Sequence, residues 1–201
     1  GSAEGAAGRK ISREAIERLV DIALHHEADE RRLRALWARH AIGTSDDAMF
    51  AQLLQDTSPH VRGWALRLML EERRDQLPAA MFSQLAELAR ADESPVVRRA
   101  ITSALYRLPV EQRWEIVEGL VAHAVDAEDH NLPLMYWYAM EPLADVDPDR
   151  ALALGMAAGE QIPKLREFML RRVAGSGGTQ AVDRMVAALS KADEPSIQRT
   201  F

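Results

Sequence analysis

The chain has 201 residues, with 25 Lys and Arg against 31 Asp and Glu, and it contains no cysteine. The formal charge of −6 argues against a general nucleic-acid binder, whose affinity comes largely from cations set against phosphates. The lack of cysteine excludes disulfides, thiolate metal ligands and a cysteine nucleophile. No apolar stretch reaches the length of a membrane-spanning helix, so we expect no membrane insertion.

Three parts follow one another along the chain. The first ten residues, rich in Gly and Ala, are expected to be disordered, and Gly1-Ser2 resembles the remnant of an expression tag. Residues 11–191 are predicted to form one helical domain. Residues 192–201 are expected to be either a tail or the start of a further helix that the chain cuts short.

Five segments share the i, i+3, i+4, i+7, i+8 apolar spacing of one buried helix face. Their first apolar residues are Leu33, Val61, Val97, Met135 and Leu165, which are 28, 36, 38 and 30 residues apart. Partner helices with their own apolar stripes lie between them, for example from Ile16 to Leu24 and from Ile116 to Ala124. A period of this length indicates stacked helical hairpins.

Helix boundaries and the lack of strand signals complete the fold prediction. N-cap residues followed by proline mark three helix starts, at Ser58-Pro59, Ser94-Pro95 and Asp147-Pro148. Pro142 falls inside a helical register and should kink or end that helix. No run alternates polar and apolar residues, so we predict an all-α fold, an α-solenoid of about five HEAT-like helical hairpins.

Arginines gather in the second helix of each predicted hairpin, among them Arg32, Arg62, Arg98 and Arg172. One interpretation is a set of ion pairs with acidic turn residues of neighbouring repeats, which contribute little each but fix the register. The other is a local basic stripe. On that second interpretation we count Arg62 and Arg98 among the candidate partner-binding residues.

The segment from Asn131 to Leu143 departs most from the repeat, because Tyr136 stands where the other repeats carry arginine. Three consecutive aromatic residues on a helix cannot all face one core. If Tyr138 is buried, then Tyr136 or Trp137 must face a groove, a neighbouring repeat or solvent. Packing against the next helix pair is one interpretation. An exposed patch of Tyr136, Trp137 and Glu141 that binds a partner is the other, since interface hot spots favour Trp and Tyr.

No catalytic or metal-binding arrangement is evident. The sequence has neither a G-x-S-x-G motif nor a phosphate-binding loop, so we predict no enzyme and no cofactor. His25 and His26 are adjacent on a helix and point about 100° apart, which disfavours joint metal binding. The acidic turn between His123 and His130 could hold a cation if its carboxylates converged, but a solvated turn is the simpler interpretation. We predict no metal.

Several runs resemble one known family. They are 32–37, 59–65, 94–98, 131–143 and 162–168, and together they lie within residues 11 to 175. They resemble the HEAT-repeat module of large secreted proteins from planctomycetes and their relatives. In that family the module lies between a sorbosone-dehydrogenase-like β-propeller and a c-type cytochrome domain with a CxxCH haem motif. This chain contains neither the propeller nor the CxxCH motif, so the resemblance implies that redox chemistry would belong to neighbouring domains.

The resemblance implies a non-catalytic scaffold that docks or spaces the propeller and cytochrome domains of an exported protein, in the periplasm or outside the cell. The concave face, built from the second helices, would make the contacts. We expect protein partners, no nucleic acid, and a monomer or an end-to-end dimer. One alternative is a DNA-glycosylase-like enzyme on a HEAT scaffold, using Trp37, Trp64, Trp137 and Glu141. Another is a stand-alone HEAT adaptor.

Overall fold

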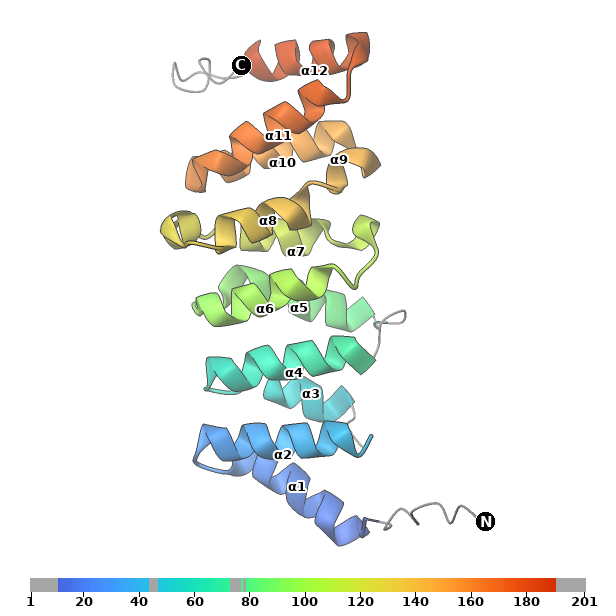
Figure 1. Cartoon of the computed structure of the whole chain (residues 1–201), viewed down its shortest axis with the longest axis vertical. Helices are drawn as coiled ribbons and strands as arrows, with labels where there is room; N and C mark the ends of the chain where they lie inside the picture. Colours follow the sequence, from blue (N-terminus) through green and yellow to red (C-terminus); the bar gives the residue numbers. More distant parts are fainter. Residues whose placement is uncertain (1–10, 44–46, 73–76, 78, 191–201) are drawn as a thin grey trace, which may run out of the picture. The chain divides into compact units, whose positions relative to one another are not determined.

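The computed structural model describes residues 11–43, 47–72, 77 and 79–190. Within these ranges every regular element is a helix and no strand is present, which confirms the all-α class (Figure 1). The expected disordered lead and the expected tail both lie outside the described residues. Contacts divide the chain into two compact units, with the boundary between Met69 and Leu70. The sequence predicts one continuous domain over residues 11–191.

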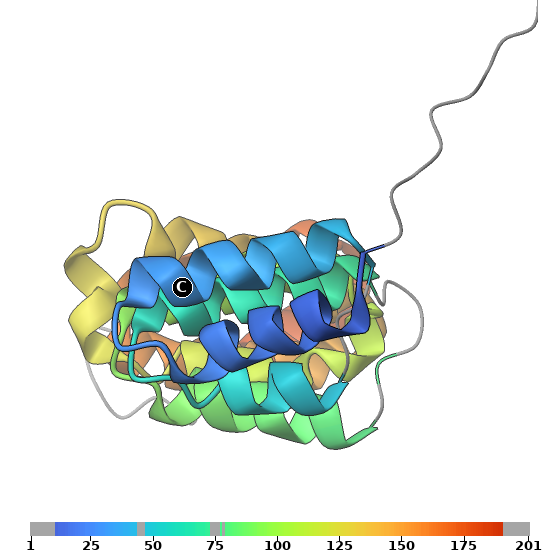
Figure 2. The ribbon, with the colours of Figure 1, turned by 90° about the horizontal axis from the view of Figure 1, so that it is seen from below.

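Unit 1 consists of helical segments that follow one another closely in sequence. They are α1 (Arg13–His25), α2 (Asp29–Ala41), α3 (Asp47–Leu53) and the part of α4 (Pro59–Glu72) that ends at Met69. Helices α1 and α2 form an antiparallel pair and lie side by side (Figure 2), and α3 packs against α1. Ser12 begins α1 by accepting a hydrogen bond from the Ala15 amide at 3.2 Å. The predicted apolar stripe from Ile16 to Leu24 therefore lies on a helix, as expected.

Unit 2 contains the remaining helices. They are α5 (Ala79–Ala91), α6 (Pro95–Leu105), the 3₁₀ turn η1 (Val110–Gln112), α7 (Trp114–Leu120), the 3₁₀ turn η2 (Ala124–Glu128), α8 (Leu132–Met140), α9 (Leu143–Val146), α10 (Pro148–Gln161), α11 (Pro163–Gly175) and α12 (Gly178–Ser190). Helix α5 packs on α7. Helix α6 packs on α8, α8 packs on α11, and α10 and α11 pack as a pair.

The three helix starts predicted from proline are confirmed, since α4, α6 and α10 begin at Pro59, Pro95 and Pro148. The helix that contains Met135 ends at Met140, before Pro142, as predicted from the missing backbone donor of proline. A separate short helix, α9, follows directly after Pro142.

The caps in front of these prolines differ from one another. Asp147 accepts hydrogen bonds from the amides of Asp149 and Arg150 at 3.1 and 3.0 Å, so it caps α10 as predicted. Ser94 makes no side-chain cap. Its amide instead donates to the Asp92 carboxylate at 2.9 Å, so the acidic residue two positions earlier shapes this turn. Ser94 therefore occupies the predicted N-cap position of α6 without the side-chain hydrogen bond of a serine cap.

Small residues set the closest helix contacts in unit 2. A Cβ added at Gly155 of α10 would lie 2.5 Å from the Cβ of Met169 in α11. No larger residue fits there without a shift of one helix. The core that results is formed by the predicted apolar faces, among them Val97, Ile101 and Leu105 of α6, all of which are buried.

Candidate interaction surface

Two arginines of unit 1, Arg32 of α2 and Arg62 of α4, bond to the turn that precedes their own helix. Nη1 of Arg32 donates to the carbonyl of His26 at 2.6 Å, and Nη2 donates to Asp56 of the next repeat's turn at 2.9 Å. Nη1 of Arg62 donates to the carbonyl of Asp56 at 2.7 Å, six residues before it. Ion pairing with a neighbouring turn is thus confirmed for Arg32. Arg62, a predicted partner-binding residue, is half-buried and holds its own turn.

Unit 2 buries the corresponding arginine completely. Arg98 is 1% exposed, and its Nη1 donates to the Asp92 carbonyl at 2.8 Å, again six residues earlier. Nε and Nη2 donate to the two oxygens of Asp126 at 2.6 and 2.5 Å. Burial by itself would lower the pKa of Arg98, but its hydrogen bonds and charge interaction with Asp126 outweigh burial and raise the pKa.

Tyr136 completes this buried group. Its hydroxyl donates to Asp126 at 2.6 Å and its side chain is 0% exposed. Burial, followed by the hydrogen bond to the Asp126 carboxylate, raises the pKa of Tyr136 far above its usual range. Tyr136, which stands where the aligned sequence segments carry arginine, therefore bonds the same carboxylate as Arg98. Because Arg98 and Tyr136 are both buried, their prediction as surface residues for a partner is wrong.

Asp126 is the residue that sequence reasoning missed. Glu128 and Asp129 of this turn are exposed, as predicted for a solvated acidic turn. Asp126, however, is 2% exposed and accepts hydrogen bonds from both Arg98 and Tyr136. His123 is also bonded into the fold, with Nε2 2.8 Å from the Ala89 carbonyl oxygen. The spacing of six residues between an arginine and the carbonyl that it bonds, as in Arg98 and Asp92, does not mark Asp126, because residue 132 is leucine.

The outer side of α8 carries exposed apolar side chains. Leu134 is 47% exposed and Tyr138 is 52% exposed, although Tyr138 was the residue expected to be buried. The inner side is instead formed by Tyr136, Ala139 and Met140, all buried. Helix α8 has apolar or aromatic residues on every side, so its whole outer face is apolar and not only one exposed residue.

Neighbouring helices extend this apolar area. Trp137 packs on Phe168 of α11, with ring centroids 5.4 Å apart, which confirms packing against the next helix pair. Tyr106 at the end of α6 is 54% exposed. Partial burial raises the pKa of Tyr106, the charge of Arg113 opposes this rise, and Tyr138 adds to it. We call Tyr106, Leu134, Trp137, Tyr138 and Phe168 the aromatic surface.

An ion-pair cluster flanks the aromatic surface. Arg172 of α11 binds Glu141, and its Nη2 lies 2.6 Å from an oxygen of Asp145. These hydrogen bonds, first to Asp145 and then to Glu141, raise the pKa of Arg172. Glu141, a predicted partner-binding residue, is therefore already held by a neighbouring helix. A carboxylate held in this way is poorly placed to act as the catalytic base of a glycosylase.

Aromatic residues also meet in unit 1. The rings of Trp37 and Trp64 pack edge to face with centroids 5.0 Å apart, and Arg67 lies over Trp64 at 4.9 Å. Trp37 remains 40% exposed. Both tryptophans thus contribute to packing between second helices.

Other site types find no support in the part of the chain that the structure describes. No three His, Asp or Glu side chains there converge in a way that could hold a metal ion. His25 lies 3.3 Å from Asp21, and Nδ1 of His26 accepts the Ala28 amide, so the two rings serve different partners. No described helix is both long and apolar enough to cross a membrane. Comparison with protein-family models, curated proteins and solved structures finds no match.

Proposed function

We propose that this chain is a non-catalytic protein-binding scaffold, and that the aromatic surface of unit 2 makes the contact. The main support for the proposal is that Leu134 and Tyr138 are each about half exposed. Both lie on α8, a helix with apolar or aromatic residues on every side. Contiguous exposed apolar area is unusual on a monomeric protein and commonly marks an interaction site. Tyr and Trp are also the residues that dominate binding energy at protein interfaces.

The wider architecture that we propose is an α-solenoid of about five HEAT-like hairpins. In unit 2, support comes from the packing of first helix on first helix and of second helix on second helix. Repeated use of an arginine that donates to the carbonyl six residues earlier gives further support, in both units. Proteins of this kind bind through extended surfaces made of successive repeats.

The setting in an exported redox protein, beside a dehydrogenase-like propeller and a c-type cytochrome, is a proposal that rests on the resemblance of the sequence runs alone. The parent open reading frame tests it. A signal peptide and propeller upstream with a CxxCH motif downstream would support this setting and a periplasmic or secreted location. A gene without these domains would leave a stand-alone adaptor.

The contact surface is tested by placing a photo-crosslinking amino acid at Tyr138 in the full-length parent protein, with a control crosslinker at Glu160. Glu160 is exposed on α10 and does not belong to the aromatic surface. We expect position 138 to crosslink to one defined protein or domain, and the Leu134→Ser substitution to reduce the yield. Equal crosslinking at both positions, or a yield that Leu134→Ser leaves unchanged in a folded protein, would contradict the proposal.

A further inference from the structure

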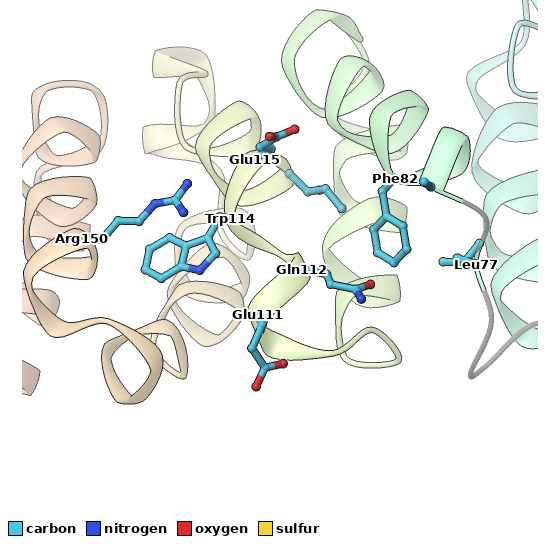
Figure 3. A pocket seen from close by; sticks show the side chains of 9 residues that line it. Leu77, Phe82, Glu111, Gln112, Trp114, Glu115 and Arg150 are labelled. Carbon is cyan, nitrogen blue, oxygen red and sulfur yellow. The ribbon is translucent and has the colours of Figure 1, made fainter.

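Unit 2 also carries a pocket, apart from the aromatic surface. This pocket of about 440 Å³ lies between α5, the η1 turn and α7, with Arg150 of α10 at one edge (Figure 3). This volume falls within the range of small-ligand sites, about 300–1,000 Å³. None of the residues of the aromatic surface lines it.

The walls of the pocket are held by backbone packing and by a buried arginine. Helices α5 and α7 approach closely at Gly119, where an added Cβ would lie 2.9 Å from the backbone nitrogen of Arg90. Arg113 is 6% exposed, and its Nε and Nη2 both donate to the Leu108 carbonyl, at 3.0 and 2.7 Å. These contacts fix the turn that carries Glu111 and Gln112 into the rim. The pocket is therefore built on rigid elements.

Its floor is apolar and aromatic. Trp114 is 7% exposed and Ile116 is 1% exposed, while Phe82 of α5 is half-buried and faces the pocket from the other side (Figure 3). Such a floor accepts an aliphatic chain or a flat group against the rings. A phenylalanine ring that lines a pocket also attracts a cation placed over its face.

The rim is acidic. Glu111 and Glu115 are exposed and line the pocket, with Gln112 between them. Arg150 supplies the opposite charge but is already engaged, because it lies 4.2 Å over the Trp114 ring and Nη2 is 3.0 Å from Glu118. The balance of charge around the pocket is negative, which favours a cationic ligand.

We propose that this pocket binds an arginine side chain, with an adjoining apolar residue, from a basic segment of a protein ligand. The guanidinium would lie over Phe82 and meet one rim carboxylate, that of Glu111 or of Glu115, which lie on opposite sides of the pocket (Figure 3), since arginine both stacks on rings and bonds carboxylates. The apolar neighbour would fill the space against Trp114, because one arginine is too small for the whole volume. The site is separate from the aromatic surface, so either proposal can fail without the other.

Titration of the whole chain with short peptides tests this site. The probes are three acetylated and amidated tetrapeptides, Leu-Arg-Phe-Arg, Leu-Gln-Phe-Gln and Leu-Glu-Phe-Glu. The chain has four tryptophans, so the indole N–H signal of Trp114 can be resolved by NMR and assigned with Trp114→Phe. We expect the basic peptide to shift this signal and the neutral peptide to bind about three- to tenfold more weakly, as two exposed ion pairs predict.

Paired variants separate this site from general attraction to an acidic protein. Glu111→Gln with Glu115→Gln should weaken binding of the basic peptide about three- to tenfold. Glu128→Gln with Glu160→Gln, which removes two exposed carboxylates outside the pocket, should leave it unchanged. No shift of Trp114, equal binding of the three peptides, or equal loss in both paired variants would overturn the proposal. Tightest binding of the acidic peptide, lost with Arg150→Gln, would also overturn it.

Discussion

Replacing Asp126 with asparagine should destabilise the fold strongly. Asp126 is 2% exposed and accepts three hydrogen bonds, two from Arg98 and one from Tyr136, all between 2.5 and 2.6 Å. Asparagine keeps the shape but removes the charge, so the buried guanidinium of Arg98 loses its counter-ion. Breaking a buried pair in this way costs about 3–5 kcal/mol. That is a large part of a typical unfolding free energy of about 5–15 kcal/mol.

The matched control is Asp145→Asn. Asp145 also pairs with an arginine, Arg172, at 2.6 Å, but its side chain is 72% exposed. An exposed ion pair contributes about 0.2–1 kcal/mol, because water screens the charges and would solvate either one alone. Arg172 also keeps Glu141 as a second partner, whereas Asp126 is the carboxylate that pairs with the buried Arg98, so the comparison sets the loss of a buried counter-ion against the loss of an exposed, replaceable one.

Urea unfolding followed by far-UV circular dichroism measures both losses in free energy. Amide hydrogen exchange measured in α6 and α8 shows whether the loss in stability lies in unit 2 rather than in unit 1. A loss below about 1 kcal/mol for Asp126→Asn, equal to the exposed control, would refute the reasoning. The triple variant Arg98→Met, Asp126→Leu, Tyr136→Phe should recover most of the loss, because an apolar replacement leaves no unpaired buried charge.

Three further predictions follow from the same packing and hydrogen bonds. Gly155→Ala should destabilise the protein by about 1–3 kcal/mol, because the new Cβ would lie 2.5 Å from the Cβ of Met169. Gly175→Ala is the control, because a Cβ there would have no atom within 4 Å, and it should not destabilise the protein. Thermal unfolding of the two variants compares the effects. Asp147→Ala should cost about 1 kcal/mol in urea unfolding, because it removes the cap of α10. The raised pKa of Tyr136 predicts that unfolding free energy falls as pH rises above about 10, where the unfolded tyrosine loses its proton and the folded one keeps it. Tyr136→Phe should show a shallower fall in pH-dependent urea unfolding, and an unchanged slope would contradict the buried hydroxyl.

Helix starts and most buried faces were accessible from the sequence because they depend on local rules. Proline at the first helical position and the spacing of apolar residues act within one turn, and they located α4, α6 and α10 correctly. The orientation of α8 was not accessible in this way. Every residue from Leu132 to Met140 is apolar or aromatic, so periodicity could not distinguish its inner face from its outer face.

The observed orientation of α8 goes with a polar contact that the hydrophobic pattern does not reveal. The hydroxyl of Tyr136 donates to Asp126, ten residues earlier, so Tyr136 faces inward while Tyr138 is exposed. The pocket was inaccessible for another reason. Its lining comes from positions as far apart as Phe82 and Arg150, which only tertiary packing brings together.

The two proposed surfaces depend unequally on the buried group around Asp126. Helix α8, which presents Leu134 and Tyr138, is anchored to the η2 turn through the bond from Tyr136 to Asp126. The pocket rests instead on the contact of α5 with α7 and on the Arg113 turn, which share no hydrogen bond with Asp126. A change at Asp126 that loosens α8 should therefore weaken the aromatic surface before it affects the pocket. The same buried charge that stabilises unit 2 thus fixes the orientation of the residues that we propose meet a partner.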